Sequence, residues 1–434
     1  MQNIIYFCIV KRFKIFFRIL AALVLTFLTV NVKAVPWATP AFPGDGLNMP
    51  ETTATSRTTA HFQREDPMAA VTISLLTCSP GAEIWSLYGH TALRVKDEKR
   101  GLDVAVNWGL FSYSQPYFIP RFIFGRCDYQ MGMEPMDIFL AEYREEGRGV
   151  IEQELNLSSA EKQQIINALG MAYQPENRTY RYNFFYDNCT TRARDMVLKH
   201  ITAAIDWHEP KGVEVSWRDM VHDWNGSHRW ARFGKDLLLG VKADSKADFR
   251  QREFLPDTLR AHFAKAQIRR DGHLQPLVLK TNTLLEAGPE ITDSSIWHTL
   301  TPTSIAVILF VIVVLLEIVE WRRRKNFIAI DILLFGLSGI TGLILLAMVF
   351  SLHPTVQVNL QILILNPLWL VLLGWALRHH GEGFHTRFFR NAVSIFFILF
   401  LIGYFIQDYA EGITILACIL MSRTIRYAPK QQEK

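Results

Sequence analysis

The sequence predicts an α+β domain outside the cytoplasm, fused to an all-α transmembrane bundle of about five helices. Three observations support this prediction: a basic and then apolar amino terminus, a middle region of ordinary soluble composition, and a last third dominated by Leu, Ile, Val and Phe. Half of the 434 residues are apolar, which favours a membrane protein. The formal net charge is +5 and the basic residues lie beside apolar runs, so nucleic-acid binding is not expected.

The amino terminus predicts export. Four basic residues precede the apolar run 19–30: Lys11, Arg12, Lys14 and Arg18. A small-residue exit at Ala34 is typical of a secretory signal over residues 1–34, although an uncleaved membrane helix fits the same pattern. Either alternative places the next domain outside the cytoplasm. Residues 35–69 are rich in Pro, Thr, Ser and Gly and predict an irregular tether.

The exported domain, residues 70–300, contains strand and helix patterns. Short β-branched runs predict strands of a small antiparallel sheet over residues 71–77, 91–95 and 104–108. Helical spacing predicts helices over residues 134–147, 159–173 and 190–201. The second of these opens with a capping signal, Ser158 and Glu161. An aromatic strand or extended segment, a helical stretch and a strand pair are predicted over residues 180–185, 217–266 and 275–285.

Residues 301–434 predict the transmembrane domain. Five apolar segments cover residues 304–319, 327–352, 360–377, 392–407 and 412–425. Several approach the roughly 17 to 25 residues that a membrane span needs. Glu317, Glu320 and Asp331 are costly if they face lipid, so each lies near the interface or inside the bundle, and we expect Glu320 at the interface.

The loops between these segments predict the orientation. Basic residues follow the first, third and fifth segments: Arg322, Arg323, Arg324 and Lys325, then Arg378, Arg387 and Arg390, then Arg423, Arg426 and Lys430. The alternate loops, residues 353–359 and 408–411, contain no Lys or Arg. The positive-inside rule therefore places the carboxyl terminus in the cytoplasm.

The exported domain contains three of the five cysteines. Cys8 precedes the apolar run of the signal and Cys418 lies in a membrane segment, which leaves Cys78, Cys127 and Cys189. An odd count in an oxidising compartment suggests a free reactive thiol or an outside partner. Cys78 and Cys127 could pair and leave Cys189 free, but the spacing alone does not decide this.

One histidine and one cysteine form the strongest candidate for chemistry. His90 begins a predicted strand, and Cys189 opens a predicted helix, where the helix dipole lowers a thiol pKa and backbone N–H groups can bind an oxyanion. Asn107 on the next strand could bond the far imidazole nitrogen and complete a Cys-His-Asn set. The alternatives are a buried or disulfide-bonded cysteine and a hydrogen-bonded structural histidine.

Four separated motifs resemble a known family. They are Leu-Leu-Thr-Cys-Ser-Pro-Gly at 75–81, Tyr-Gly-His-Thr-Ala-Leu-Arg-Val at 88–95, Asn-Trp-Gly-Leu-Phe at 107–111, and Tyr-Asn-Phe-Phe-Tyr-Asp-Asn-Cys-Thr-Thr-Arg at 182–192. In this order they resemble the N-terminal periplasmic domain of the Lnb-type lipoprotein N-acyltransferases, and the resemblance extends to the membrane bundle. The histidine-before-cysteine order also resembles circularly permuted papain-like hydrolases, including the lecithin:retinol acyltransferase group.

The resemblance implies a reaction and its site residues. Cys189 would be the acyl-accepting nucleophile, His90 the general base and then acid, and Asn107 the orienting residue. The acyl donor would be a membrane phospholipid, and the acceptors would be diacylglyceryl-cysteine lipoproteins. The protein would be a multi-pass protein of the bacterial inner membrane with a periplasmic N-terminal domain. Three residues beside the motifs could donate to the oxyanion or could serve packing and turns: Tyr88, Tyr186 and Asn188.

Two other functions remain open, and cofactors are not expected. The rivals are a papain-like cell-wall amidase or peptidase and a non-catalytic sensor or assembly factor in which Cys189 is structural. No phosphate-binding Gly loop precedes a helix, and no carboxylate or cysteine completes a metal site with His379, His380 and His385. A group of aromatic residues could form a lip facing the membrane or part of the core: Phe111, Tyr113, Tyr117, Phe118, Phe122 and Phe124.

Overall fold

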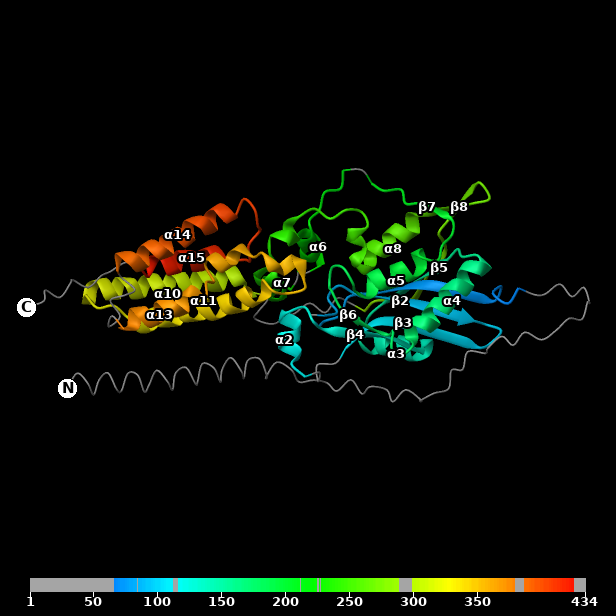
Figure 1. The fold of residues 1–434 in the computed structure, drawn as a ribbon, viewed down its shortest axis with the longest axis horizontal. Coiled ribbons are helices and arrows are strands. Elements are labelled where there is room, and N and C mark those ends of the chain that lie inside the picture. The colour runs from blue at the N-terminus through cyan, green and yellow to red at the C-terminus, as the bar shows by residue number, and fades with distance from the viewer. Residues whose placement is uncertain are drawn as a thin grey trace, which may run out of the picture. The chain divides into compact units, whose positions relative to one another are not determined.

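The computed structural model describes residues 66–83, 85–111, 116–210, 212–224, 226, 228–288, 299–378 and 386–424. A sheet-rich part is followed by a group of apolar helices, which confirms the predicted fold class (Figure 1). The predicted signal at 1–34, nearly all of the tether, Tyr113 and the histidines at 379, 380 and 385 lie outside the described residues.

The three predicted strands form the centre of a seven-stranded antiparallel sheet. They are β1 (Val71–Cys78), β2 (His90–Asp97) and β3 (Leu102–Leu110). The strand order is β10-β5-β1-β2-β3-β4-β6, and the added strands are β4 (Asp128–Pro135), β5 (Val150–Leu155), β6 (Thr179–Arg181) and β10 (Val278–Leu285). Gly89 has φ +78°, and a Cβ there would lie 2.5 Å from the carbonyl oxygen of Cys78, so a glycine must lead the chain into β2.

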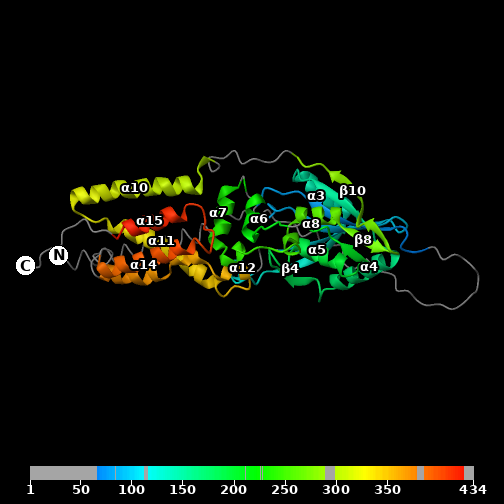
Figure 2. The same cartoon turned by 90° about the horizontal axis from the view of Figure 1, so that it is seen from above.

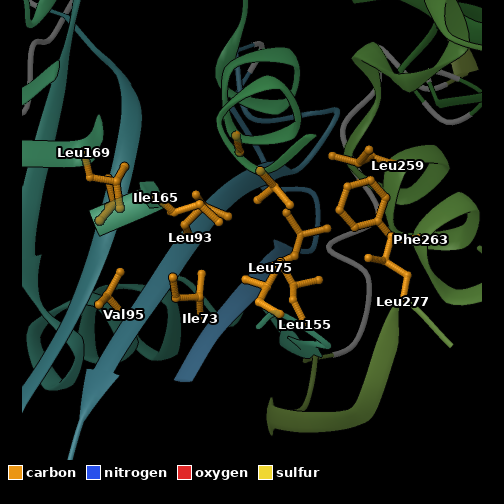
Figure 3. Close-up of a cluster of buried hydrophobic side chains, with 14 of the residues drawn as sticks. Ile73, Leu75, Leu93, Val95, Leu155, Ile165, Leu169, Leu259, Phe263 and Leu277 are labelled. Carbon is orange, nitrogen blue, oxygen red and sulfur yellow. The ribbon is translucent and has the colours of Figure 1, made fainter. Parts of the chain in front are cut away.

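Helices cover both faces of this sheet. α4 (Ser159–Tyr173), α5 (Cys189–Leu198) and α8 (Pro256–Lys265) pack on one face, and α3 (Met136–Glu145) packs on the other. Figure 3 shows the first face, where Leu75, Leu93 and Phe263 are fully buried. Complete burial of one such side chain stabilises the fold by roughly 1.5–3 kcal/mol. The predicted capping box at Ser158 and Glu161 is present at the start of α4.

Two predicted elements differ from the structure. The helix expected over 134–147 begins at Met136, because residues 134 and 135 end β4 and pair with β3. The strand pair expected over 275–285 is two strands in different sheets. β9 (His273–Pro276) pairs with β8 (Gln267–Arg270), which also pairs with β7 (Ala204–Asp206). β10 instead lies at the edge of the large sheet, where it pairs with β5. Figure 2 labels β8 and β10.

Among the described residues, five main helices form the bundle: α10 (Pro302–Arg323), α11 (Ile328–Met348), α13 (Leu368–Arg378), α14 (Arg387–Gly403) and α15 (Ile413–Ser422). A short helix, α12 (Pro354–Gln357), and a 3-10 turn, η3 (Leu360–Leu363), precede α13. Among the described residues, three stretches are long and apolar enough to cross a membrane: 302–323, 328–348 and 354–378. Large apolar side chains such as Leu315 and Phe405 are exposed on the bundle, as expected for a surface in lipid.

The charged residues of the bundle are buried together. Arg423 donates to Glu320 at 2.5 and 2.9 Å and to Asp331 at 2.8 Å, and Glu317 lies 3.8 Å from the same guanidinium. Glu320 is 1% exposed and faces Arg423, so it packs inside the bundle, three residues before the end of α10. Arg423 itself is a buried bundle residue and not a loop cation.

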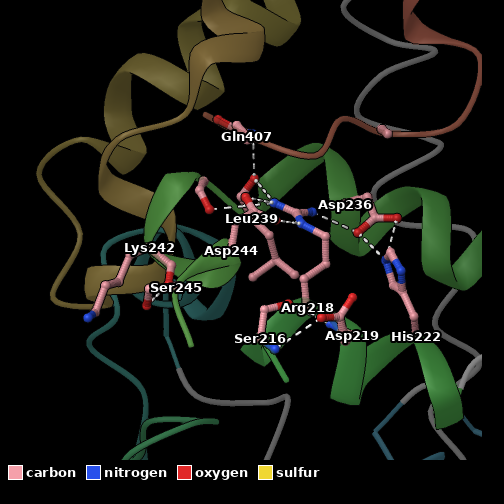
Figure 4. Close-up of polar contacts among 12 residues, drawn as sticks. Ser216, Arg218, Asp219, His222, Asp236, Leu239, Lys242, Asp244, Ser245 and Gln407 are labelled. Atoms are coloured by element: carbon pink, nitrogen blue, oxygen red, sulfur yellow. Dashed lines mark hydrogen bonds and ion pairs between the residues drawn. The ribbon is translucent and has the colours of Figure 1, made fainter. Parts of the chain in front are cut away.

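The predicted helical stretch 217–266 contains α6 (Trp217–Trp224), α7 (Arg229–Leu238) and two 3-10 turns, η1 (Val241–Asp244) and η2 (Gln251–Phe254), before α8. The last carbonyl groups of a helix have no N–H donor within the helix. Amide side chains of the bundle satisfy them here: Gln361 donates to the carbonyl of Asp236 at 2.8 Å, and Gln407 donates to the carbonyl of Leu239 at 3.0 Å. Beside them Arg218, which is almost fully buried, forms ion pairs with Asp236 and Asp244 (Figure 4).

Candidate active site

A chain of polar side chains crosses three neighbouring strands. His90 and Ala92 lie on the same face of β2, and Ala92 pairs with Asn107 of β3. Ala105, two residues before Asn107, pairs with Glu134 of β4. His90 Nε2 lies 3.0 Å from Asn107 Oδ1, and Asn107 Nδ2 donates to Glu134 Oε1 at 2.5 Å. The strand register therefore brings His90, Asn107 and Glu134 into one hydrogen-bonded row.

This row determines which nitrogen of the imidazole donates a hydrogen bond to Asn107. An ionised carboxylate only accepts hydrogen bonds, so Asn107 must turn its Nδ2 towards Glu134 and its Oδ1 towards His90. His90 Nε2 is then the donor, which leaves Nδ1 for the thiol. Burial and the nearby Glu142 raise the pKa of Glu134 to about 7, so this carboxylate is fully ionised only above neutral pH.

Cys189 occupies the first turn of α5. Asn188 is the N-cap, and its side chain and Thr191 form a reciprocal capping box. The thiol is partly buried, and the side chain of His90 and the backbone N–H of Thr91 lie close enough to lower its pKa. Thr190 Oγ1 lies 3.8 Å from Sγ. The structure thus places the predicted cysteine beside the predicted histidine.

The surroundings of Cys189 favour its thiolate. Burial acts to raise the pKa of Cys189, but the charge and hydrogen bond of His90, with the donors from Thr91 and Thr190, outweigh it and lower the pKa to about 7. The pKa of His90 is raised, because the attraction and hydrogen bond of Cys189 exceed the effect of burial. Near neutral pH the pair therefore favours a thiolate beside an imidazolium, the reactive state of a cysteine nucleophile.

Two small features hold the cysteine at this point. The hydroxyl groups of Thr190 and Thr91 lie 3.1 Å apart, which ties the first turn of α5 to β2. Gly109, near the end of β3, has φ +107°, and a Cβ there would lie 4.0 Å from Cys189 Cβ. The strand therefore approaches the cysteine without a side chain in between.

The other thiols of the exported domain are not activated. Cys78, Cys127 and Cys189 are all free, so Cys78 and Cys127 do not form the pair that the sequence left open. Burial raises the pKa of Cys78 to about 12, although a hydrogen bond with Tyr143 opposes it. Burial also raises the pKa of Cys127. Cys189 is therefore the thiol of this domain whose pKa is lowered.

The three predicted oxyanion donors have different surroundings. Asn188 Nδ2 donates to the carbonyl groups of Phe184 and Phe254, both at 2.9 Å, so its side-chain donors are used in holding the turn. This geometry fits the alternative in which Asn188 serves the turn, and a role of Asn188 at the oxyanion stays a prediction. The ring of Tyr88 packs on Phe184 at 4.8 Å, and the partly exposed Tyr186 packs on a tryptophan ring at 5.1 Å. Their role at an oxyanion stays a prediction.

Glu134 is the site residue that the sequence did not reveal. Its neighbours have helical spacing, so it was expected at the start of a helix, whereas it lies in β4 opposite Ala105. The sequence offers one sign of a strand end here. Glu134 precedes Pro135, and proline has no backbone N–H to donate to a neighbouring strand. Among the described residues, no group of three or more His, Cys, Asp or Glu side chains could hold a metal ion.

Two family models match the chain. The model described as the Lnb N-terminal periplasmic domain matches residues 58–222, and the model described as the Lnb transmembrane domain matches residues 292–434. The first match contains His90, Asn107, Glu134 and Cys189, and the second contains all five main helices of the bundle. No curated protein and no solved structure matches the chain.

Proposed function

The chain belongs to the Lnb family, as a membrane protein with a periplasmic domain, and from this premise we propose that it is a lipoprotein N-acyltransferase that uses Cys189 as its nucleophile. The observation that carries the proposal is the partly buried thiol at the start of α5, placed beside His90, whose charge lowers the pKa of Cys189 to about 7. The histidine strand precedes the cysteine helix, as in circularly permuted papain-like enzymes, and this order supports the same chemistry.

The reaction has two half-reactions. The Cys189 thiolate attacks an ester carbonyl of a phospholipid, the C–O bond breaks, and the leaving alkoxide takes a proton from the His90 imidazolium. A lysophospholipid leaves and a thioester remains. The α-amine of a diacylglyceryl-cysteine lipoprotein then attacks the thioester while His90 accepts its proton. The C–S bond breaks, an amide forms, and the thiolate returns.

The first turn of α5 can stabilise the oxyanion. The N–H groups of Cys189 and Thr190 have no acceptor inside the helix, and the positive end of the dipole lies at the same place. Removing one oxyanion-hole donor costs about 2.7–4 kcal/mol in another acyl-transfer enzyme. Asn107 keeps the imidazole in the required tautomer.

The membrane bundle supports this function because both substrates have acyl chains in a bilayer. We place the periplasmic domain at residues 70–300 and the transmembrane domain at 301–434, in the inner membrane with a cytoplasmic carboxyl terminus. The exposed basic residues at the ends of α10 and α14 support this orientation: Arg322, Arg323, Arg324, Lys325, Arg387 and Arg390.

Intact mass tests the acyl-enzyme. We expect purified protein incubated with phospholipid to gain one acyl chain on Cys189 that hydroxylamine removes, and a lipoprotein amine added afterwards to accept it. The Cys189→Ser protein is the control and gains no hydroxylamine-labile chain. An alkylatable Cys189 that never gains an acyl mass would favour the amidase, and a disulfide at Cys189 would favour a structural role.

Glu134 provides a second test, as a positioning residue. We expect Glu134→Leu to lower kcat by on the order of tenfold to a hundredfold, because Asn107 can then rotate its amide and lose its hold on His90. Glu134→Gln retains an oxygen that accepts from Asn107 Nδ2, so most of the activity returns. The KM for phospholipid is expected to change little in both variants. Equal losses of kcat in the two variants would contradict a positioning role.

A further inference from the structure

A short aromatic segment lies between the candidate site and the bundle. α2 (Phe118–Ile123) is flanked by Tyr117 before it and Phe124 after it. Tyr117 is 80% exposed, Phe122 50% and Phe124 36%, so these residues do not belong to the core. Large apolar side chains exposed together mark a surface that another apolar body covers.

This segment is continuous with the membrane-facing surface of the bundle. The backbone N–H of Leu352 donates to the carbonyl of Phe124 at 3.0 Å, and α2 packs against α11. Gly125 has φ +65°, and a Cβ there would lie 3.0 Å from the ring of His353. Phe350 and Leu352, which follow α11, are 72% and 52% exposed. The lipid that surrounds α11 therefore also reaches the aromatic surface of α2.

The same segment leads to the thiol. A series of stacked rings starts at α2 and has centroid separations of 6.4, 6.3, 4.7 and 4.1 Å: Phe122, Phe118, Phe111, Tyr129 and Tyr182. Phe111 stands two residues after Gly109, whose missing side chain faces Cys189. Two residues of chain span at most about 7 Å. An acyl chain that lies along these rings can thus present its carbonyl end at Cys189.

A cation stands at the end of the aromatic segment. The guanidinium of Arg126 is exposed and has no hydrogen bond or ion pair with any residue in the described part of the chain, whereas the guanidinium of Arg121 is paired with Asp128 at 2.5 Å. Aromatic residues beside arginine are typical of segments that lie in the membrane interface and bind anionic head groups. The chemistry of Arg126 fits the phosphate of a phospholipid.

We propose that residues 117–126 form the docking site of the acyl donor, in which the rings of α2 receive an acyl chain from the bilayer and Arg126 binds the phosphate. The proposal rests on the proposed function, since it names the route by which phospholipid reaches Cys189.

Photolabelling tests the docking site without turnover. The full-length Cys189→Ala protein is placed in phosphatidylethanolamine and phosphatidylglycerol vesicles containing a trace of phospholipid with a diazirine on its acyl chain. After irradiation, we expect label on the peptide containing residues 117–126. The double variant Tyr117→Ser and Phe122→Ser should lose about tenfold of this label, given the apolar area removed. Label found only on bundle peptides, or unchanged in the double variant, would overturn the proposal.

A matched control and a second donor separate docking from chemistry. Met171→Ser removes an apolar side chain that is 69% exposed on α4 and is expected to leave the labelling unchanged. Arg126→Gln is expected to slow acylation of Cys189 by phospholipid several-fold, while acylation by the soluble short-chain ester p-nitrophenyl acetate keeps its rate. Equal slowing with both donors would contradict the docking role, whereas wild-type protein that accepts no acyl group from either donor would instead contradict the proposed function.

Discussion

We expect the replacement of His90 with glutamine to lower the proposed acyl transfer by on the order of 10²–10⁴-fold, because the thiol loses its base and the leaving group loses its acid. The same change acts on the thiol itself. In the wild-type protein the pKa of Cys189 is lowered to about 7, with burial opposing the attraction and hydrogen bond of His90. Without the imidazole, burial is the largest remaining influence, and the pKa of Cys189 rises.

Alkylation by iodoacetamide measures this change without substrate. In the wild-type protein the labelling rate of Cys189 rises with pH through about pH 7, because the thiolate reacts and the thiol does not. In His90→Gln we expect the rate at about pH 7.5 to fall more than about tenfold, since the thiolate becomes a minor species. The rise with pH moves to higher pH in the variant.

A control variant and a control cysteine show whether a change in labelling is specific to His90 and Cys189. His200→Gln is the matched control, because His200 lies beyond the other end of α5 and bonds the carbonyl of Met196 at 2.7 Å. Cys78, whose burial raises its pKa to about 12, should stay unlabelled in every folded variant. If His90→Gln labels Cys189 at the wild-type rate and pH, the thiol is not activated by His90 and the proposed mechanism fails.

The positions of the cysteine and the histidine could be predicted because local signals determine them. Asn188 and Thr191 form a capping box at the start of α5, and such a box is recognisable from a few adjacent residues. The β-branched runs of β1, β2 and β3 likewise show their strands directly. Asn107 followed from the third of these runs, and the structure places its Oδ1 3.0 Å from His90.

Contacts between distant segments could not be predicted in the same way. Glu134 has neighbours with helical spacing, yet its pairing with β3 overrides that preference and brings it to Asn107. Asn188 lies within a motif next to the cysteine, but its amide bonds to the carbonyl of Phe254, 66 residues later. Arg423 belongs to a basic carboxyl-terminal sequence, and only the packing of the bundle brings it to Asp331. Strand register and helix packing decide these roles, and neither is a local property.

Replacing Arg423 with methionine is expected to destabilise the bundle by about 3–5 kcal/mol, because it removes one partner of a buried ion cluster. Glu320 and Asp331 are both 1% exposed or less, and both accept hydrogen bonds from the guanidinium. After the change their carboxylates lie buried without a cation. Thermal unfolding of the detergent-solubilised protein, followed by the loss of soluble folded protein, measures the effect.

A triple variant separates two causes of the lower stability: the uncompensated buried carboxylates and the lost packing of the arginine side chain. Adding Glu320→Gln and Asp331→Asn to Arg423→Met removes the uncompensated charge, so we expect most of the stability to return. Arg260→Met is the matched control, because Arg260 pairs with Asp257 where both side chains are about one-third exposed, and its loss should cost at most about 1 kcal/mol. If the triple variant unfolds as early as Arg423→Met, packing of the long side chain, and not charge compensation, is what Arg423 contributes. If Arg423→Met and Arg260→Met unfold at the same temperature, the buried cluster does not stabilise the bundle.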